Sequence, residues 1–213
     1  MNVHSQIDPM NQSKEIPLAD QRTAEILESA RAAFSEKGFD GASMQDLARK
    51  AGMSVGNFYR YFPSKAAIVS ALIAQNMVEM EQDFAAILEE DDPLAAFRSK
   101  IAARIEEARC RAEGQLWAEI TAASLRKPEI CEVACKMEDE IIGHLVRVFA
   151  HITQCGTDEA YSLWSTHARL IVMLVKSCAM QRPNLPELAN LETLVLRTID
   201  RTLEDISLLA VKG

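Results

Sequence analysis

A short stretch in the first third of the chain has the residue types that contact nucleic acids. It reads Ser54-Val-Gly-Asn-Phe-Tyr-Arg-Tyr-Phe62 and is followed by Pro63-Ser64-Lys65. The side chains of Asn57 and Arg60 can hydrogen-bond to base edges or to phosphates. A lysine at the start of a helix, where free N–H groups gather, adds a site for one more phosphate. Gly56 leaves room for the backbone to approach DNA closely. These residues predict contacts with double-stranded DNA.

Two short helices are expected to position this stretch. Ser43, with Asp46 three residues later, is a capping-box variant that starts a helix running to about residue 51. Gly52 ends that helix, and Ser54 caps a second one that reaches Phe62. Two short helices joined by a tight glycine turn form a helix-turn-helix, whose second helix enters the major groove.

The spacing along the second helix divides its side chains into two faces. Val55, Phe58 and Phe62 lie three to four residues apart and are expected to pack inward. Tyr59 and Tyr61 then project to the flanks, where their phenolic hydroxyls can meet phosphates.

Two stretches resemble the DNA-binding domain of the TetR family. They are Ile26-Leu-Glu-Ser-Ala-Arg-Ala-Ala-Phe-Ser-Glu-Lys-Gly-Phe39 and Ser43-Met-Gln-Asp-Leu-Ala-Arg-Lys-Ala-Gly-Met-Ser-Val-Gly-Asn-Phe-Tyr-Arg-Tyr-Phe-Pro-Ser-Lys65. The resemblance covers about residues 20–70, in order and without gaps, and the run from Phe58 to Lys65 is highly specific to the family. With the residues singled out above, it implies these DNA contacts: Ser43, Ser54, Gly56, Asn57, Tyr59, Arg60, Tyr61 and Lys65.

The resemblance also implies an architecture and a mode of action. A three-helix head (20–66) would precede a helical body (67–213) that binds an effector. The segment before the head (residues 1–19) shows no apolar periodicity and contains Pro9 and Pro17, so it is expected to be a disordered arm. The last two helices would pair with those of a second subunit, giving a homodimer. In the family, an effector in the body usually moves the two heads apart and releases the operator, which implies a repressor relieved by a small molecule. Whether the regulator represses or activates depends on where the operator lies.

Composition and periodicity independently predict an all-α fold. The 213 residues include only 8 Gly and 7 Pro, while the strong helix formers Ala, Leu and Glu dominate. Apolar residues recur at helical spacing throughout. About nine helices are expected, at about 20–37, 43–51, 54–62, 64–90, 93–111, 117–125, 128–152, from 157 and from 188, with Gly114 separating the fifth from the sixth.

The net charge of -8 is unevenly distributed. Residues 1–65 carry 8 basic and 8 acidic residues, so the whole excess of acid lies in residues 66–213. Within residues 43–65, four basic residues oppose only Asp46, which gives a local net charge of +3. A small positive face can bind DNA beside an acidic body, because phosphate attraction acts over a Debye length of about 8–10 Å. The N-terminal segment has only Lys14 and Arg22, so no extra minor-groove contact is expected from it.

Several apolar and polar side chains of the body are candidates for an effector cavity. Such cavities are mostly apolar with a few polar anchors, and the candidate set is Phe97, Arg104, Trp117, Met137, Tyr161, Trp164 and His167. Each also suits an ordinary helical core. His167 can equally be a histidine of the core or of the dimer interface. Arg104 can equally form an ion pair or lie at a solvated edge. The effector's identity stays open.

Other classes of function find less support in the sequence. Cys131 and Cys135 lie four residues apart and suggest a metal or redox pair, but a metal site needs three or four ligands. A helical-bundle metalloprotein would need Glu-x-x-His pairs, so neither an enzyme nor a metal or other cofactor is expected. A protein-interaction adaptor that keeps the head without reading DNA is a further alternative.

The sequence predicts a cytoplasmic protein that does not enter a membrane. The first twenty residues lack the pattern of a signal peptide. The longest apolar run, from Leu170 to Val175, is far shorter than the roughly 20 residues of a membrane span. Five cysteines at irregular spacing favour reduced thiols over a disulfide framework.

Overall fold

A computed structural model of the protein describes residues 18–109, 112–181 and 188–210. Across these ranges the chain forms nine helices and no strand, which confirms the all-α prediction. The helices are α1 (Leu18–Gly41), α2 (Met44–Lys50), α3 (Val55–Tyr61), α4 (Lys65–Glu89), α5 (Pro93–Arg109), α6 (Ala112–Ser124), α7 (Pro128–Thr153), α8 (Thr157–Ala179) and α9 (Leu188–Ala210). None of these described helices is long and apolar enough to cross a bilayer. The expected arm lies outside the described residues, except for Leu18 and Ala19, which begin α1.

Three serines start the helices that follow α1. The Ser43 hydroxyl accepts a hydrogen bond from the N–H of Asp46, at 3.1 Å, and begins α2. Ser54 accepts from the N–H of Asn57 at 3.3 Å and begins α3. Ser64 does the same for α4. Because each cap satisfies an N–H group that has no partner within the helix, the sequence located these starts to within one residue.

The chain bends sharply near the end of α1. Gly38 has φ 72 and ψ 164 inside this element, a combination that is open essentially to glycine alone. The regular helix therefore ends at the predicted Lys37-Gly38, and one further turn leads to Gly41. Residues 38–40, which we call the elbow, form the bend.

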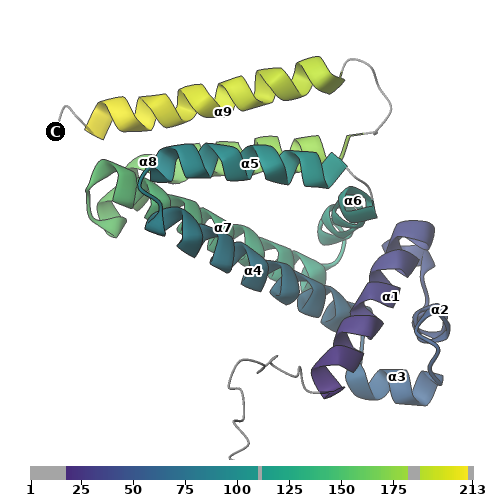
Figure 1. Ribbon diagram of the computed structural model, residues 1–213. Coiled ribbons are helices and arrows are strands. Elements are labelled where there is room, and N and C mark those ends of the chain that lie inside the picture. Colours follow the sequence, from purple (N-terminus) through teal and green to yellow (C-terminus); the bar gives the residue numbers. More distant parts are fainter. Residues whose placement is uncertain (1–17, 110–111, 182–187, 211–213) are drawn as a thin grey trace, which may run out of the picture.

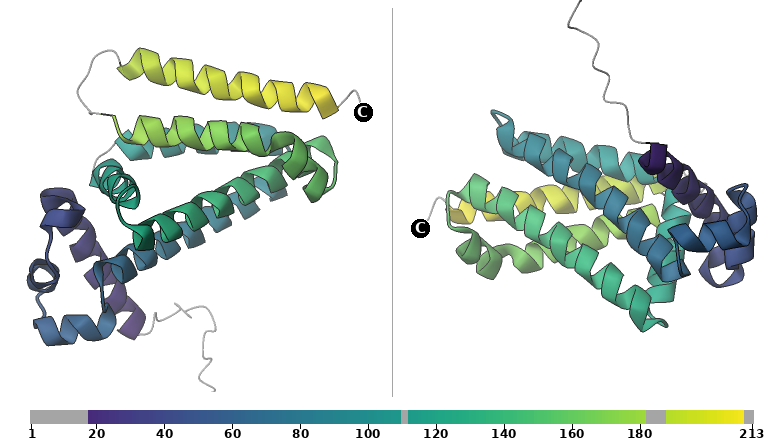
Figure 2. Two further views of the ribbon diagram at one scale, coloured as in Figure 1. Left: turned by 180° about the vertical axis from the view of Figure 1, so that it is seen from behind. Right: turned by 90° about the horizontal axis from the view of Figure 1, so that it is seen from below.

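The head, α1 to α3, lies at one end of the helical body (Figure 1). Helix α4 leads out of the head beside α7, and α5 lies beside α8 (Figures 1 and 2). Helix α9 forms the edge of the body and contacts α5, α7 and α8. Helix α6 lies between head and body, because it contacts both α1 and α7.

Two clusters of buried side chains stabilise these parts. The head core joins Phe34, Phe58 and the start of α4 to α6 and to the beginning of α7. The body core is built from α4, α5, α7, α8 and α9, around Phe97 and Phe149. The head is therefore packed against the body and is not an independent lobe.

One predicted boundary in the body is wrong. Gly114 was expected to separate two helices, but it is buried inside α6, which begins at Ala112. A helix tolerates an internal glycine at a cost of only about 1 kcal/mol relative to alanine, and tertiary packing of α6 against α1 and α7 offsets that cost.

Candidate functional site

Helix α3 presents a polar face to solvent. Phe58 is fully buried and Phe62 nearly so, their ring centroids 6.2 Å apart, as predicted. Tyr59 is 47% exposed, and Asn57, Arg60 and Tyr61 are exposed beside it. A Cβ added at Gly56 would meet nothing within 4 Å, so the fold itself does not require glycine there. One helix thus combines an apolar anchor with hydrogen-bonding groups that face outward.

Val55 departs from the expected pattern. It shares the spacing of Phe58 and Phe62 but is 38% exposed, so the prediction that it packs inward is wrong. Val55 is the first residue of α3, and α3 packs chiefly on α2. The first turn of α3 therefore projects beyond the core.

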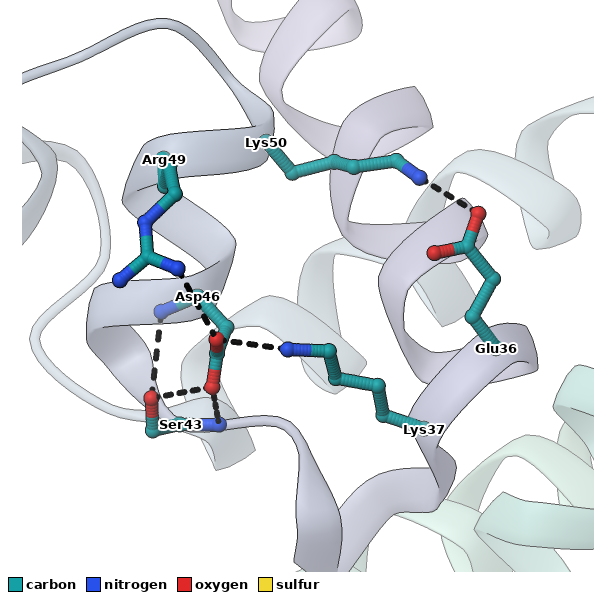
Figure 3. A network of polar contacts seen from close by, with 6 residues as sticks. All are labelled: Glu36, Lys37, Ser43, Asp46, Arg49 and Lys50. Carbon is teal, nitrogen blue, oxygen red and sulfur yellow. Dashed lines mark hydrogen bonds and ion pairs between the residues drawn. The ribbon is translucent and has the colours of Figure 1, made fainter.

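A network of polar contacts holds α2 against α1 (Figure 3). The Asp46 carboxylate accepts a hydrogen bond from the Ser43 N–H and forms an ion pair with Lys37, at 2.7 Å. Lys37 and the hydroxyl and N–H of Ser43 hold the pKa of Asp46 well below its usual range. Lys50 forms a second ion pair between the two helices, with Glu36. Ser43, a predicted DNA contact, thus already has a structural role as the cap of α2.

Lys65 also has partners within the protein. Its ammonium donates to the carbonyl oxygen of Phe39 at 2.7 Å and lies 4.7 Å from the centre of the Phe39 ring. Partial burial lowers the pKa of Lys65, because desolvation disfavours the charged form. This lysine therefore connects the start of α4 to the elbow, a role that its spacing in the sequence did not indicate.

The elbow is also held by α6 and by the turn that follows it. The Glu119 carboxylate accepts a hydrogen bond from the N–H of Phe39 at 2.9 Å. Arg126 and Lys127 each lie 3.0 Å from the Asp40 carboxylate, and both cations lower the pKa of Asp40. These contacts join residues about eighty positions apart, and no periodic pattern predicts them.

A cavity of about 720 Å³ lies between α4, α5, α6, α7 and α8. Its volume falls in the usual range for small-molecule sites, about 300–1,000 Å³. Four of the seven predicted lining residues are in its wall: Phe97, Arg104, Trp117 and Met137. The sequence did not indicate Asn76, Lys100, Glu138, Arg169 or Lys176, which also line it.

The other three predicted lining residues lie outside this cavity. Tyr161 is 48% exposed on α8, whereas Trp164 is buried in the body core. The ring of His167 packs edge-on against Trp164, with centroids 5.2 Å apart. Helical spacing places these residues together on α8, but it does not predict which neighbouring helix they pack against.

Cys131 and Cys135 do lie together on α7, with their sulfur atoms 3.6 Å apart. The neighbouring Cys131 thiol raises the pKa of Cys135, which disfavours the reactive thiolate. Within the described parts of the chain, no group of three or more His, Cys, Asp or Glu side chains is placed to hold a metal ion.

Comparison with known proteins shows to which family the head belongs. Residues 26–72 match the model of a family described as bacterial regulatory proteins, tetR family. The head is a TetR-family domain. The chain is 49% identical to an uncharacterized HTH-type transcriptional regulator, YvdT of Bacillus subtilis, over 53 residues. This aligned segment covers 25% of this chain and 27% of YvdT. Over 84 residues the chain is 36% identical to the HTH-type transcriptional regulator RutR of Escherichia coli, 39% of this chain and 40% of RutR.

The TetR-family match ends within α4, so the body is compared by fold alone. Salmonella enterica GusR superposes with a TM-score of 0.70 and 24% identity, covering 91% of this chain and all of GusR. The curated relatives align with this chain over less than half of their own length. The fold likeness to GusR, by contrast, covers most of this chain.

Proposed function

We propose that the protein is a homodimeric, ligand-responsive transcriptional repressor that binds double-stranded operator DNA through α3. The observation that carries this proposal is the outward polar face of α3, with Asn57, Tyr59 and Arg60 exposed on a helix that Phe58 anchors. An exposed set of donors on a short, capped helix suits base and phosphate contacts in a major groove. We propose no catalytic activity for the chain. We also propose that it acts in the cytoplasm, together with its operator DNA.

An apolar surface on α8 and α9 supports the homodimer. Large hydrophobic side chains are exposed along both helices: Leu163, Leu170 and Met173 on α8, with Leu191, Leu194 and Leu208 on α9. Exposed apolar side chains that gather on two neighbouring helices indicate an interaction site. Pairing two copies through these helices gives the two heads that a two-fold symmetric operator needs.

The position of α6 supports a response to a ligand. One part of its surface lines the cavity through Trp117, Ile120 and Thr121, and Glu119 holds the elbow of the head. A ligand that favours another position of α6 therefore also moves the head, and it weakens DNA binding without touching DNA.

Gel-shift binding to the DNA upstream of the gene tests this function. The control is a scrambled duplex, and both are measured at two salt concentrations. We expect a specific shift with two chains per site that weakens steeply as salt rises, because phosphate contacts release counterions. Equal binding to the upstream and the scrambled duplex, together with no enriched site after selection from random duplexes, would contradict this function. It would favour the alternative of an interaction adaptor that does not read DNA.

A further inference from the structure

The charged side chains of the cavity wall are already paired with one another. Among the described residues of the wall, the cations are Lys100, Arg104, Arg169 and Lys176. Lys100 lies 2.7 Å from Asp83, and Lys176 lies 2.9 Å from Glu138. Arg169 lies 3.1 Å from Asp139, and Arg104 lies 3.8 Å from Glu107. All four carboxylates are in the same wall.

This pairing disfavours an anionic ligand. Burying a charge is costly unless a counter-charge compensates it, and each cation here already has a carboxylate neighbour. The fifth carboxylate of the described wall, Glu79, belongs to an exposed residue and is therefore solvated. The uncharged part of the described wall is mainly apolar and includes Phe84, Phe97 and Trp117.

One polar side chain lies in this part of the wall without a partner among the described residues. Asn76 of α4 is only 6% exposed and lines the cavity. Among the described residues, the only other buried polar side chain is Thr202, which donates to the carbonyl oxygen of Thr198. No hydrogen bond joins the Asn76 amide to any other described residue. The fully buried, unpaired polar atoms of the described residues belong to Arg98, Trp164 and His167, so the Asn76 amide is not sealed off but is accessible, and its residue lines the cavity. It therefore offers a ligand two donors and one carbonyl acceptor.

Asn76 also lies where a ligand would affect the head. Its neighbours on α4, Ile73 and Met77, belong to the head core, whereas Phe84 packs against the body core. The cavity thus borders both cores, and Asn76 is at the side nearer the head.

We propose, on the basis of the proposed function, that the effector is an uncharged, largely apolar molecule with one carboxamide-like group that pairs with Asn76. An N–H donor beside a carbonyl acceptor is the group that satisfies both ends of the asparagine amide. The apolar remainder fills the space lined by Phe84, Phe97 and Trp117.

Calorimetric titration of the full chain with three probes tests this inference. Octanamide and octanoate share a seven-carbon alkyl tail, octylammonium has one methylene more, and the three probes differ in the charge of the polar group. We expect octanamide to bind about tenfold more tightly than either ion, the equivalent of one well-placed hydrogen bond and an avoided charge burial. Tighter binding of octanoate or octylammonium, or no binding of any probe, would overturn the inference.

Two substitutions at Asn76 locate the contact. Asn76→Leu removes the amide and should weaken octanamide about tenfold, whereas Asn76→Asp should shift the preference to octylammonium. The matched control is Gln82→Leu, which removes an amide from an exposed residue of the same wall and should leave the ranking unchanged. Unchanged octanamide binding in Asn76→Leu would contradict the assignment. Should an Asn76 variant fail to fold, the ranking with the unaltered protein still decides.

Gel shifts with the same preparations separate this inference from the proposed function. A preference for octanamide without specific DNA binding would support the cavity assignment and reject the regulator. Specific DNA binding with a preference for an ion would keep the regulator and reject the assignment of the effector class.

Discussion

At the scale of single residues, Asn57 and its neighbours on α3 carry the proposed reading of DNA. The backbone N–H of Asn57 is held by Ser54, while its side chain is exposed. An amide that hydrogen-bonds a base edge discriminates among bases, whereas a phosphate contact adds affinity for every sequence. The two kinds of contact can therefore be separated by comparing operator variants.

Asn57→Ala should change the preference among operator variants and not only the affinity. The loss of one good base contact is worth about 1–3 kcal/mol of discrimination. Gel-shift affinities for a set of single-base operator variants measure it, with Tyr59→Ala as the comparison because a phosphate contact should weaken all variants alike. Uniform weakening in Asn57→Ala would show that this side chain does not read bases.

Asp46 makes the stability of the head depend on pH. Its pKa is depressed by Lys37 and Ser43, so the ionised carboxylate stabilises the folded head. This contribution is complete above the ordinary aspartate pKa of 3.8 and is lost as the pH falls through the lower pKa of the folded state. Asp46→Asn should lower the melting temperature at neutral pH and flatten its fall in acid. Parallel curves for the two proteins would contradict this account.

At the scale of elements, the contact between the elbow and α6 is the feature on which coupling depends. A Cβ at Gly38 would lie 2.9 Å from the Glu119 carboxylate oxygen, the same atom that accepts from the N–H of Phe39. Gly38→Ala should therefore cost about 1–3 kcal/mol of unfolding free energy from backbone strain, and it should also break the Glu119 hydrogen bond.

A double-mutant cycle measured by urea unfolding isolates that second effect. In a Glu119→Ala background, Gly38→Ala should cost less, with a coupling of about 1 kcal/mol. Strictly additive costs would mean that α6 and the elbow are not coupled through Glu119.

The elements also show what a sequence can reveal. Ser43, Ser54 and Ser64 located helix starts because capping is a local interaction between residues three apart. Periodicity does not specify which helices are neighbours. For that reason it did not predict that Val55 is exposed, that Gly114 lies inside a helix, or that Trp164 packs in the body core and not in the cavity wall. Asn76 has helical spacing like its apolar neighbours, so only the packed structure reveals it as a buried polar residue that lines the cavity.

At the scale of the whole molecule, the proposed binding to a two-fold symmetric operator needs two copies of the chain. Leu194 on α9 is 55% exposed on the proposed pairing surface. Leu194→Glu should bury a charge in the dimer and shift the protein towards monomer, as measured by analytical ultracentrifugation. Leu125→Glu, at a position that is 84% exposed and outside α8 and α9, is the matched control and should leave the dimer unchanged. An unaltered dimer in Leu194→Glu would place the interface elsewhere.

The central claim is that a dimer of this chain reads DNA through α3, and selection of bound sites from random duplexes tests it most directly. We expect enriched sites with two symmetric halves whose centres are about 34–36 Å apart, one helical turn of DNA. An Asn57→Ala, Arg60→Ala double variant, altered only on the exposed face of α3, should no longer enrich them. Failure to enrich any sequence, or enrichment of the same sites by the variant, would contradict the claim.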